Sequence, residues 1–243
     1  MSENLTSVHP AAVDKAFEAL ATYDYGSARA SLLPIDDAVR SSLRDAAARQ
    51  ELERRLAAVL SAKASPVAKE YVCAKLGLLG GAGAVPALAA LLPEPALSHA
   101  ACGALEAISC PEAVEALGAS LPKLSGLLKV GVINSLGARQ DARSVPALTA
   151  LLKDADTQVA AAAAAALGSI GTVEAAKALR AFQPKAPEAM RLAVADACLA
   201  CAERLLAKGK KAAAQALYQA LATTQQPKHV QLAAKRGLAL SRK

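Results

Sequence analysis

Tryptophan is absent from this 243-residue chain, which has only two Phe and four Tyr. Hydrophobic residues nevertheless make up 54% of the sequence, so Ala, Leu and Val have to fill the core. That hydrophobic content excludes a disordered polymer. Ala is the strongest helix former, whereas β-rich chains favour Val, Ile, Thr and aromatic residues. The composition therefore predicts an all-α fold.

Long apolar runs and a secretory leader are also missing. No run of about 18 apolar residues free of charge or strong polarity occurs, so we expect no membrane span. The N-terminal stretch MSENLTSVHP has no basic region followed by an apolar one. This favours a cytoplasmic protein, although an excised module of a larger exported protein would show the same pattern.

The cysteines are five in number, which leaves one over if they pair, and this favours reduced thiols. Cys198 and Cys201 form a CxxC inside a continuous helical pattern, so both sulfurs are expected on one helix face beside the apolar stripe. A structural zinc site needs four ligands, usually from two such pairs, and only one pair is present. We therefore expect core cysteines, and neither a metal nor another cofactor.

Internal repeats organise the chain. Four similar short segments begin at Ala84 (AVPALAALL), Ala113 (AVEALGASL), Ser144 (SVPALTALL) and Thr172 (TVEAAKALR), at steps of 29, 31 and 28 residues. Two of them carry a proline after the first valine, a position that suits the first turn of a helix.

A second series marks the partner helices. Its alignment places one leucine in each, at steps of 29, 31, 31, 32 and 39: Leu76, Leu105, Leu136, Leu167, Leu199 and Leu238. A period of about 30 residues split into two helices is typical of an α-solenoid, a superhelix of stacked repeats. We predict about five to six stacked two-helix repeats with helical caps at both ends.

The domain division follows from this period. Residues 1–49 form an N-terminal helical cap, residues 50–204 the repeats, and residues 205–243 a basic helix pair that closes the C-terminal end. Helical patterns near the N-terminus cover residues 9–24, 25–33 and 34–63. The last region gives two helices separated by the sequence TTQQP.

The units at Ala84 and at Ser144–Gly171 resemble HEAT-like repeats of the short bacterial kind, also called PBS-lyase HEAT-like repeats. A typical unit has an Asp-containing loop, then Val-Arg, then an Ala-rich second helix ending in ALG. Asp154, Asp156, Val159, Leu167 and Gly168 match this pattern, whereas Ala160 replaces the usual Arg. The resemblance implies that the second helices line the concave side. We interpret the seven consecutive alanines from Ala160 as spacing between closely packed helices.

Catalytic motifs are scarce. His9, His99 and His229 lie far apart in the repeat order and none sits in a His-Glu pair, so the metal centre of HEAT-like hydroxylases is not expected. No GxGxxG, Walker-type loop or GxSxG occurs. The glycine-rich GLLGGAGAVP joins two helical patterns, and we interpret it as a repeat connection rather than a phosphate loop.

HEAT-like enzymes provide the catalytic alternative. The alkylpurine DNA glycosylases of this kind rely on tryptophans that this chain lacks, and no residues for the pocket of a phycobilin lyase stand out. We therefore expect no enzyme, with the lyase or glycosylase type as the alternative.

Charge is distributed unevenly. Residues 204–243 contain nine Lys or Arg and no Asp or Glu, whereas the remaining 203 residues carry 19 basic and 21 acidic groups. The candidate partner-binding residues of this basic end are Lys208, Lys210, Lys211, Lys228, Lys235 and Arg236, with Arg242 and Lys243 following. Such a cluster attracts acidic proteins or phosphates, although it also fits a solvated capping helix that keeps the chain soluble.

The aligned second helices add three further candidates, Lys69, Lys129 and Asn134, among columns of small and weakly charged residues. Only Tyr218 is available in the basic end to stack a base, so sequence-specific single-strand recognition is not expected. We predict a scaffold that binds a protein partner through its curved surface and basic C-terminal end, with nucleic-acid binding as the alternative.

Overall fold

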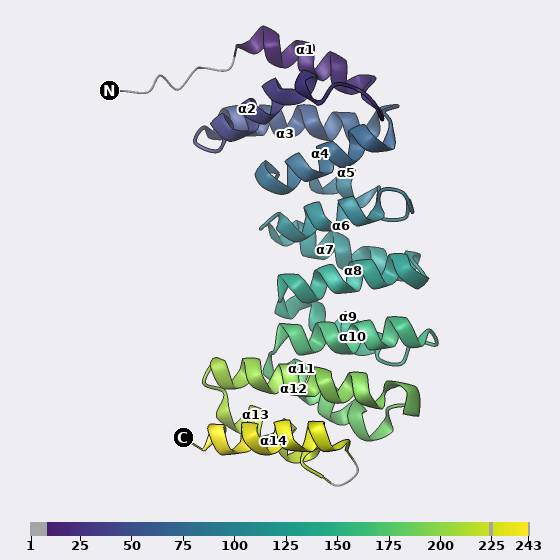
Figure 1. Cartoon of the computed structure of the whole chain (residues 1–243), viewed down its shortest axis with the longest axis vertical. Coiled ribbons are helices and arrows are strands. Elements are labelled where there is room, and N and C mark those ends of the chain that lie inside the picture. The colour runs from purple at the N-terminus through teal and green to yellow at the C-terminus, as the bar shows by residue number, and fades with distance from the viewer. Residues whose placement is uncertain (1–8, 224–225, 243) are drawn as a thin grey trace, which may run out of the picture. The chain divides into compact units, whose positions relative to one another are not determined.

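The computed structural model describes residues 9–223 and 226–242. Within these residues the chain forms fourteen α-helices and five short 3₁₀ turns, and no strand, which confirms the all-α prediction (Figure 1). The chain divides into two compact units, Met1–Ser120 and Leu121–Lys243. The division into residues 1–49, 50–204 and 205–243 stays a prediction. None of the described helices is both long and apolar enough to cross a membrane.

The first unit contains seven helices: α1 (Pro10–Ala21), α2 (Leu33–Ser42), α3 (Ala46–Ser61), α4 (Pro66–Leu79), α5 (Val85–Ala89), α6 (Ser98–Ala107) and α7 (Pro111–Ser120). Helices α2, α3, α4 and α6 pack one on the next along the chain, and α5 packs against α6 and α7. The small residues between α4 and α6 allow close contact, because a Cβ added to Gly77 would lie 3.4 Å from the Cα of Ala104.

The N-terminal helical patterns differ in detail from the structure. The pattern over residues 34–63 is divided into α2 and α3, because the Asp45 carboxylate accepts hydrogen bonds from the backbone N–H groups of Ala47 and Ala48, at 3.0 and 3.1 Å, and starts a new helix there. The pattern over residues 25–33 yields only the 3₁₀ turn Arg29–Leu32 ahead of α2. The third helical pattern therefore corresponds to two helices, and the second to a 3₁₀ turn.

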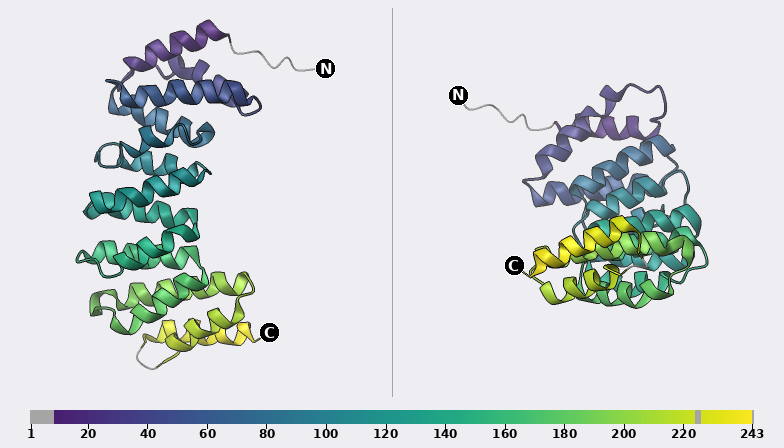
Figure 2. Two further views of the ribbon diagram at one scale, coloured as in Figure 1. Left: turned by 180° about the vertical axis from the view of Figure 1, so that it is seen from behind. Right: turned by 60° about the horizontal axis from the view of Figure 1, so that its bottom comes forward.

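The second unit contains the other seven: α8 (Gly126–Arg139), α9 (Val145–Leu151), α10 (Thr157–Ile170), α11 (Val173–Phe182), α12 (Arg191–Ala207), α13 (Lys211–Leu221) and α14 (Lys228–Ser241). The even-numbered helices form one layer, in which α10 packs between α8 and α12. The odd-numbered helices form the other, in which α11 lies between α9 and α13 (Figure 2). Each odd-numbered helix also packs on the even-numbered helix that follows it. This arrangement confirms the α-solenoid of stacked helix pairs.

Helix ends follow the sequence signals. Prolines stand in the first turns of α5 and α9, as their positions predict. Helix α10 begins where the Asp156 carboxylate accepts a hydrogen bond from the Gln158 N–H at 2.9 Å. It ends at Ile170, and the next residue, Gly171, has a φ of 58°, the left-handed conformation that glycine adopts without strain. These signals therefore fix the lengths of the stacked helices.

The leucine column is confirmed in four helices and wrong in two. Leu76, Leu105, Leu136 and Leu167 are all at most 1% exposed. In α12, however, Leu199 is only partly buried, and the core position belongs to Cys198, which is 1% exposed and lies 31 residues after Leu167. In α14, likewise, Gly237 is buried while Leu238 is only partly so. The alignment was one residue out of register in both helices.

The alanine run packs as expected from its composition. Ala160, Ala163, Ala164 and Ala166 are buried, and α10 packs against both α8 and α12. A Cβ added to Gly137 of α8 would lie 2.9 Å from the Cα of Ala166. Small side chains therefore set the spacing of this layer, which confirms their interpretation as spacers.

Candidate functional site

The basic residues of the C-terminal end lie on the last two helices. Lys210 and Lys211 open α13, whereas Lys228, Lys235 and Arg236 lie on α14, and all five are exposed. Lys243 lies outside the described residues. Of these five cations, Lys210 and Lys211 line a groove.

Lys208 points elsewhere. Its ammonium group donates hydrogen bonds to the backbone carbonyls of Ile170 and Gly171, at 3.2 and 3.3 Å, at the end of α10. A cation at this end also interacts favourably with the helix dipole. Lys208 therefore stabilises the junction of α10 and α12, and it is not one of the residues that line the groove.

The groove lies between α11 and α13, within the second unit. Its volume is about 610 Å³. Four cations line it, Lys177 and Arg180 from α11 and Lys210 and Lys211 from α13, and within the described chain none of the lining residues is acidic. The site therefore joins two of the expected cations to two that the sequence reasoning did not single out.

Small side chains create this hollow. The facing positions of α11 and α13 carry Ala176, Ala213 and Ala216, with Val173 and Leu217 beside them. None of the alanines is large enough to fill the space between two helix backbones. The floor is consequently apolar, while the cations stand around it.

The first turn of α13 is electropositive. Gly209, with a φ of 71°, turns the chain sharply out of α12, and Lys210 follows as the N-cap residue without a side-chain capping bond. The positive end of the helix dipole thus coincides with two lysines. The arrangement favours an anionic group at this end of the groove.

The candidates on the second helices are not part of the groove. Lys129 of α8 forms an ion pair with Asp154, at 3.3 Å, in the loop before α10. The Asp156 N–H and Lys129 lower the pKa of Asp154. Asn134 is exposed on α8, and Lys69 is half-buried on α4. Lys129 therefore connects neighbouring repeats, a polar contact present even though Ala160 replaces the Arg of the typical unit.

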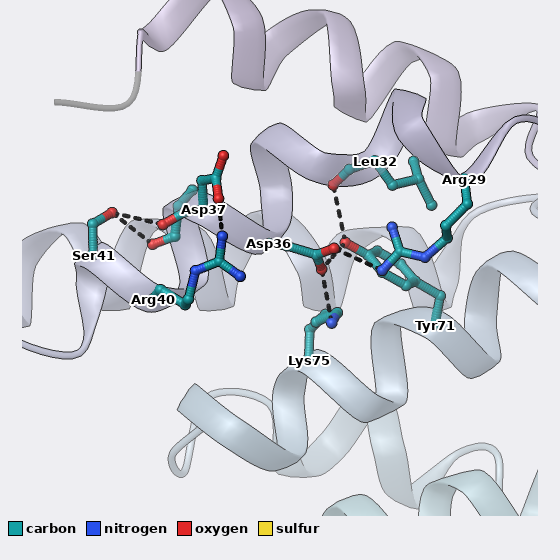
Figure 3. Close-up of polar contacts among 9 residues, drawn as sticks. Arg29, Leu32, Asp36, Asp37, Arg40, Ser41, Tyr71 and Lys75 are labelled. Carbon is teal, nitrogen blue, oxygen red and sulfur yellow. Dashed lines mark hydrogen bonds and ion pairs between the residues drawn. The ribbon is translucent and has the colours of Figure 1, made fainter. Parts of the chain in front are cut away.

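The first unit has its own charged cluster, centred on Asp36 of α2 (Figure 3). Its carboxylate accepts hydrogen bonds from Arg29 at 2.6 Å and Tyr71 at 2.9 Å, and pairs with Lys75 at 2.8 Å. Burial would raise the pKa of Asp36, but the hydrogen bonds from Lys75, Arg29 and Tyr71 hold it below its usual value. Since α4 supplies Tyr71 and Lys75, this cluster ties α2 to α4.

The glycine-rich connection after α4 is held by an acidic side chain. The backbone N–H groups of Gly81 and Ala84 donate hydrogen bonds to the Glu53 carboxylate of α3, at 2.9 and 2.8 Å. These are the groups that a phosphate would otherwise use. The loop therefore anchors α3 to the next repeat.

The CxxC pair is buried in α12. Cys198 and Cys201 are at most 1% exposed, and the Cys201 thiol lies 4.0 Å from the Thr172 carbonyl to which it donates. Burial raises the pKa of Cys198 to about 12 and that of Cys201 to about 11. Within residues 9–223 and 226–242, no group of three or more His, Cys, Asp or Glu could hold a metal ion.

The two missed cations, Lys177 and Arg180, carried a usable signal. They stand three residues apart in the segment that begins at Thr172, so they share a helix face. A charge count along the chain does not single them out, because they lie before the basic end. Counting by repeat would have placed them beside the next odd-numbered helix.

Stacked helix pairs with exposed layers define this protein as an α-solenoid of the kind that presents extended surfaces. Residues 121–200 match the family model for HEAT repeats, so this part of the chain consists of HEAT repeats. That match does not test the narrower resemblance to short bacterial repeats. No curated protein matches the chain.

Two solved structures are similar. Human deoxyhypusine hydroxylase in complex with glycerol is 15% identical, with 95% of this chain and 96% of that chain covered and a TM-score of 0.41. An engineered protein is 22% identical, with 86% of this chain and 96% of that chain covered and a TM-score of 0.42.

Proposed function

We propose that this protein is a non-catalytic scaffold that binds an acidic partner protein through the basic end of its second unit. The observation that carries the proposal is the segregation of charge. The last 40 residues hold nine basic and no acidic groups, and five of the cations stand exposed on α13 and α14. An acidic protein surface would be attracted to such an end, and the attraction would weaken with salt.

The mechanism is recognition by a preformed surface. Helices α8, α10 and α12 approach one another through alanine and glycine, so no long flexible side chain separates them at these close contacts. A stiff surface loses little conformational freedom on binding, which leaves more of the contact energy as affinity. We also propose a cytoplasmic location, which the odd number of cysteines supports, and the short bacterial type of HEAT-like repeat.

Nucleic-acid binding is the second candidate, favoured by the same cations. The structure offers it less support than sequence alone suggested, since Tyr218 is 2% exposed and its ring is covered by the packing of α13 and α14. A base could not stack on it without unpacking these helices.

Affinity capture from the native cell tests the proposal. The bait is the full chain, compared with a variant in which Lys210, Lys211, Lys228, Lys235 and Arg236 are changed to Glu. We expect the wild-type bait to retain acidic proteins at low salt and to release them as the salt concentration rises. We expect the variant to retain none of these proteins. Recovery of the same proteins on both baits would refute binding by the basic end.

An electrophoretic shift assay with single-stranded DNA and RNA tests the second candidate, nucleic-acid binding. If the basic end binds nucleic acid, wild type should give a shift that disappears in the variant.

A further inference from the structure

We infer that the groove between α11 and α13 seats an acidic amphipathic helical segment of a partner protein. This rests on the proposed function and deepens it, because it names the place of binding and the chemistry of the bound segment. It also assigns a role to two residues outside the basic end, Lys177 and Arg180, which line the groove on the α11 side.

The floor of the groove favours apolar side chains. Ala176, Ala213 and Ala216 leave a hollow of about 610 Å³, which Val173 and Leu217 also line. This lies within the size range of pockets that bind specific ligands, about 300 to 1,000 Å³. Water over such a floor has few polar groups to bond, so apolar side chains that replace it bind favourably. A ligand that is only charged would leave this surface uncovered.

The rim of the groove favours acidic groups on both sides of the apolar floor. Lys177 and Arg180 flank it from α11, and Lys210 and Lys211 flank it from α13. A helix with leucine-sized residues along one face and carboxylates on both flanks matches this order of charges. The two helices that form the walls are 10 and 11 residues long, which corresponds to about 15 Å of groove. A segment of about ten helical residues therefore fits it.

The start of α13 gives an independent reason to expect a carboxylate. Lysines in the first turn of a helix oppose its dipole, and acidic residues are normally favoured there. Lys210 and Lys211 occupy this turn without a side-chain cap, so the free protein keeps an unfavourable local arrangement. An acidic residue of a bound segment would relieve it. The first turn of α13 is thus less stable than it could be in the free protein, and binding of an acidic segment stabilises it.

A nucleic acid fits the same groove less well. Its phosphates would contact the rim, but its bases would meet alanines, and the aromatic ring of the same helix, Tyr218, is buried. Stacking on exposed aromatic rings supplies much of the affinity for single strands. We therefore assign the groove to a protein segment.

Fluorescence anisotropy with a synthetic probe tests the inference. The probe is a labelled peptide of about 14 residues, about four helical turns, with leucines along one face and glutamates on both flanks. A peptide of the same composition with its order scrambled lacks the apolar stripe, and a single-stranded oligonucleotide of equal charge provides the nucleic-acid arm. All are titrated against the full chain at low salt, and binding is repeated at higher salt.

Two matched double variants locate the binding. Lys177→Glu with Lys211→Glu reverses two charges of the groove, whereas Lys235→Glu with Arg236→Glu reverses two charges of α14 outside it. Ala216→Trp fills the floor without altering the charge. Circular dichroism confirms that each variant is folded. We expect the groove double variant and Ala216→Trp to weaken the peptide by about tenfold or more, and the α14 pair to have less than a threefold effect.

The outcomes separate this inference from the proposed function. Equal weakening by the two double variants, or equal binding of the scrambled peptide, overturns the groove as the seat while leaving an acidic partner of the basic end in place. Tighter binding of the oligonucleotide than of the peptide overturns the assignment to a protein segment. No binding of any acidic probe to wild type at low salt overturns both proposals.

Discussion

Gly168 is the position where the packing of the even-numbered layer can be tested most directly. A Cβ added here would lie 2.7 Å from the carbonyl oxygen of Ala197 and 3.1 Å from its Cα. Both are backbone atoms of α12, so no side-chain rotation relieves the clash and α12 has to move. Overpacking of this kind costs about 1 to 3 kcal/mol. The higher helix propensity of Ala offsets about 0.8 to 1.0 kcal/mol of that cost.

The control is the same substitution where there is room. Gly103 lies within α6, and a Cβ added there would meet nothing within 4 Å. Gly103→Ala should therefore stabilise the protein by about 0.8 to 1.0 kcal/mol, whereas Gly168→Ala should destabilise it by up to about 2 kcal/mol. Because the propensity gain is common to both, the difference between the variants isolates the cost of the clash, about 1 to 3 kcal/mol.

Urea denaturation followed by far-ultraviolet circular dichroism measures this difference. Hydrogen exchange read by mass spectrometry adds its location, and exchange should rise in α10 and α12 for Gly168→Ala alone. If Gly168→Ala proved as stable as Gly103→Ala, with unchanged exchange in both helices, the close approach of α10 and α12 would be refuted.

Three further predictions concern charge and thiols. Lys211→Glu should stabilise the free protein by about 0.3 to 1 kcal/mol, since an acidic residue suits the first turn of α13, and a lower melting temperature would contradict this. Asp36→Asn should destabilise the first unit by about 1.5 to 3 kcal/mol. The matched change Asp37→Asn should cost less than about 0.5 kcal/mol, because the exposed Asp37 carboxylate pairs with Arg40 of its own helix. Because the folded-state pKa of Asp36 is lowered, its contribution to the free energy of unfolding is present above the unfolded pKa of about 3.9 and is lost as the pH falls through the folded value. Urea titrations of wild type and Asp36→Asn should therefore converge in acid. Burial raises the pKa of Cys198 to about 12 and that of Cys201 to about 11, so both thiols should resist maleimide at about pH 8 in the folded chain and react once the chain is unfolded. Mass spectrometry that found both cysteines labelled in the folded chain would contradict this.

Those parts of the fold that depend on local chemistry were predictable from the sequence. Prolines of the first turn mark where α5 and α9 begin, and the steps between Leu76, Leu105 and Leu136 give the period of the stack. Each of these signals acts within one helix or between consecutive repeats. Such regularities persist because every repeat has to bury the same face against its neighbours.

The register in α12 could not be read from leucines alone. The core position there is filled by Cys198, which packs as a small hydrophobe, and the larger Leu199 beside it drew the alignment one residue away. The groove escaped notice for a different reason. Its cations come from two helices and lie 30 to 34 residues apart in the sequence, and they meet only because odd-numbered helices of successive repeats are neighbours. Charge counted along the chain does not contain that information.

The register correction also bears on how closely the even-numbered helices approach one another. Glycine follows the core leucine in α8 and α10, at Gly137 and Gly168, and each approaches an alanine of the next even-numbered helix. In α12 the corresponding residue, one after Cys198, is Leu199. A leucine at the glycine position does not allow so close an approach, so we expect α14 to lie further from α12 than α12 lies from α10.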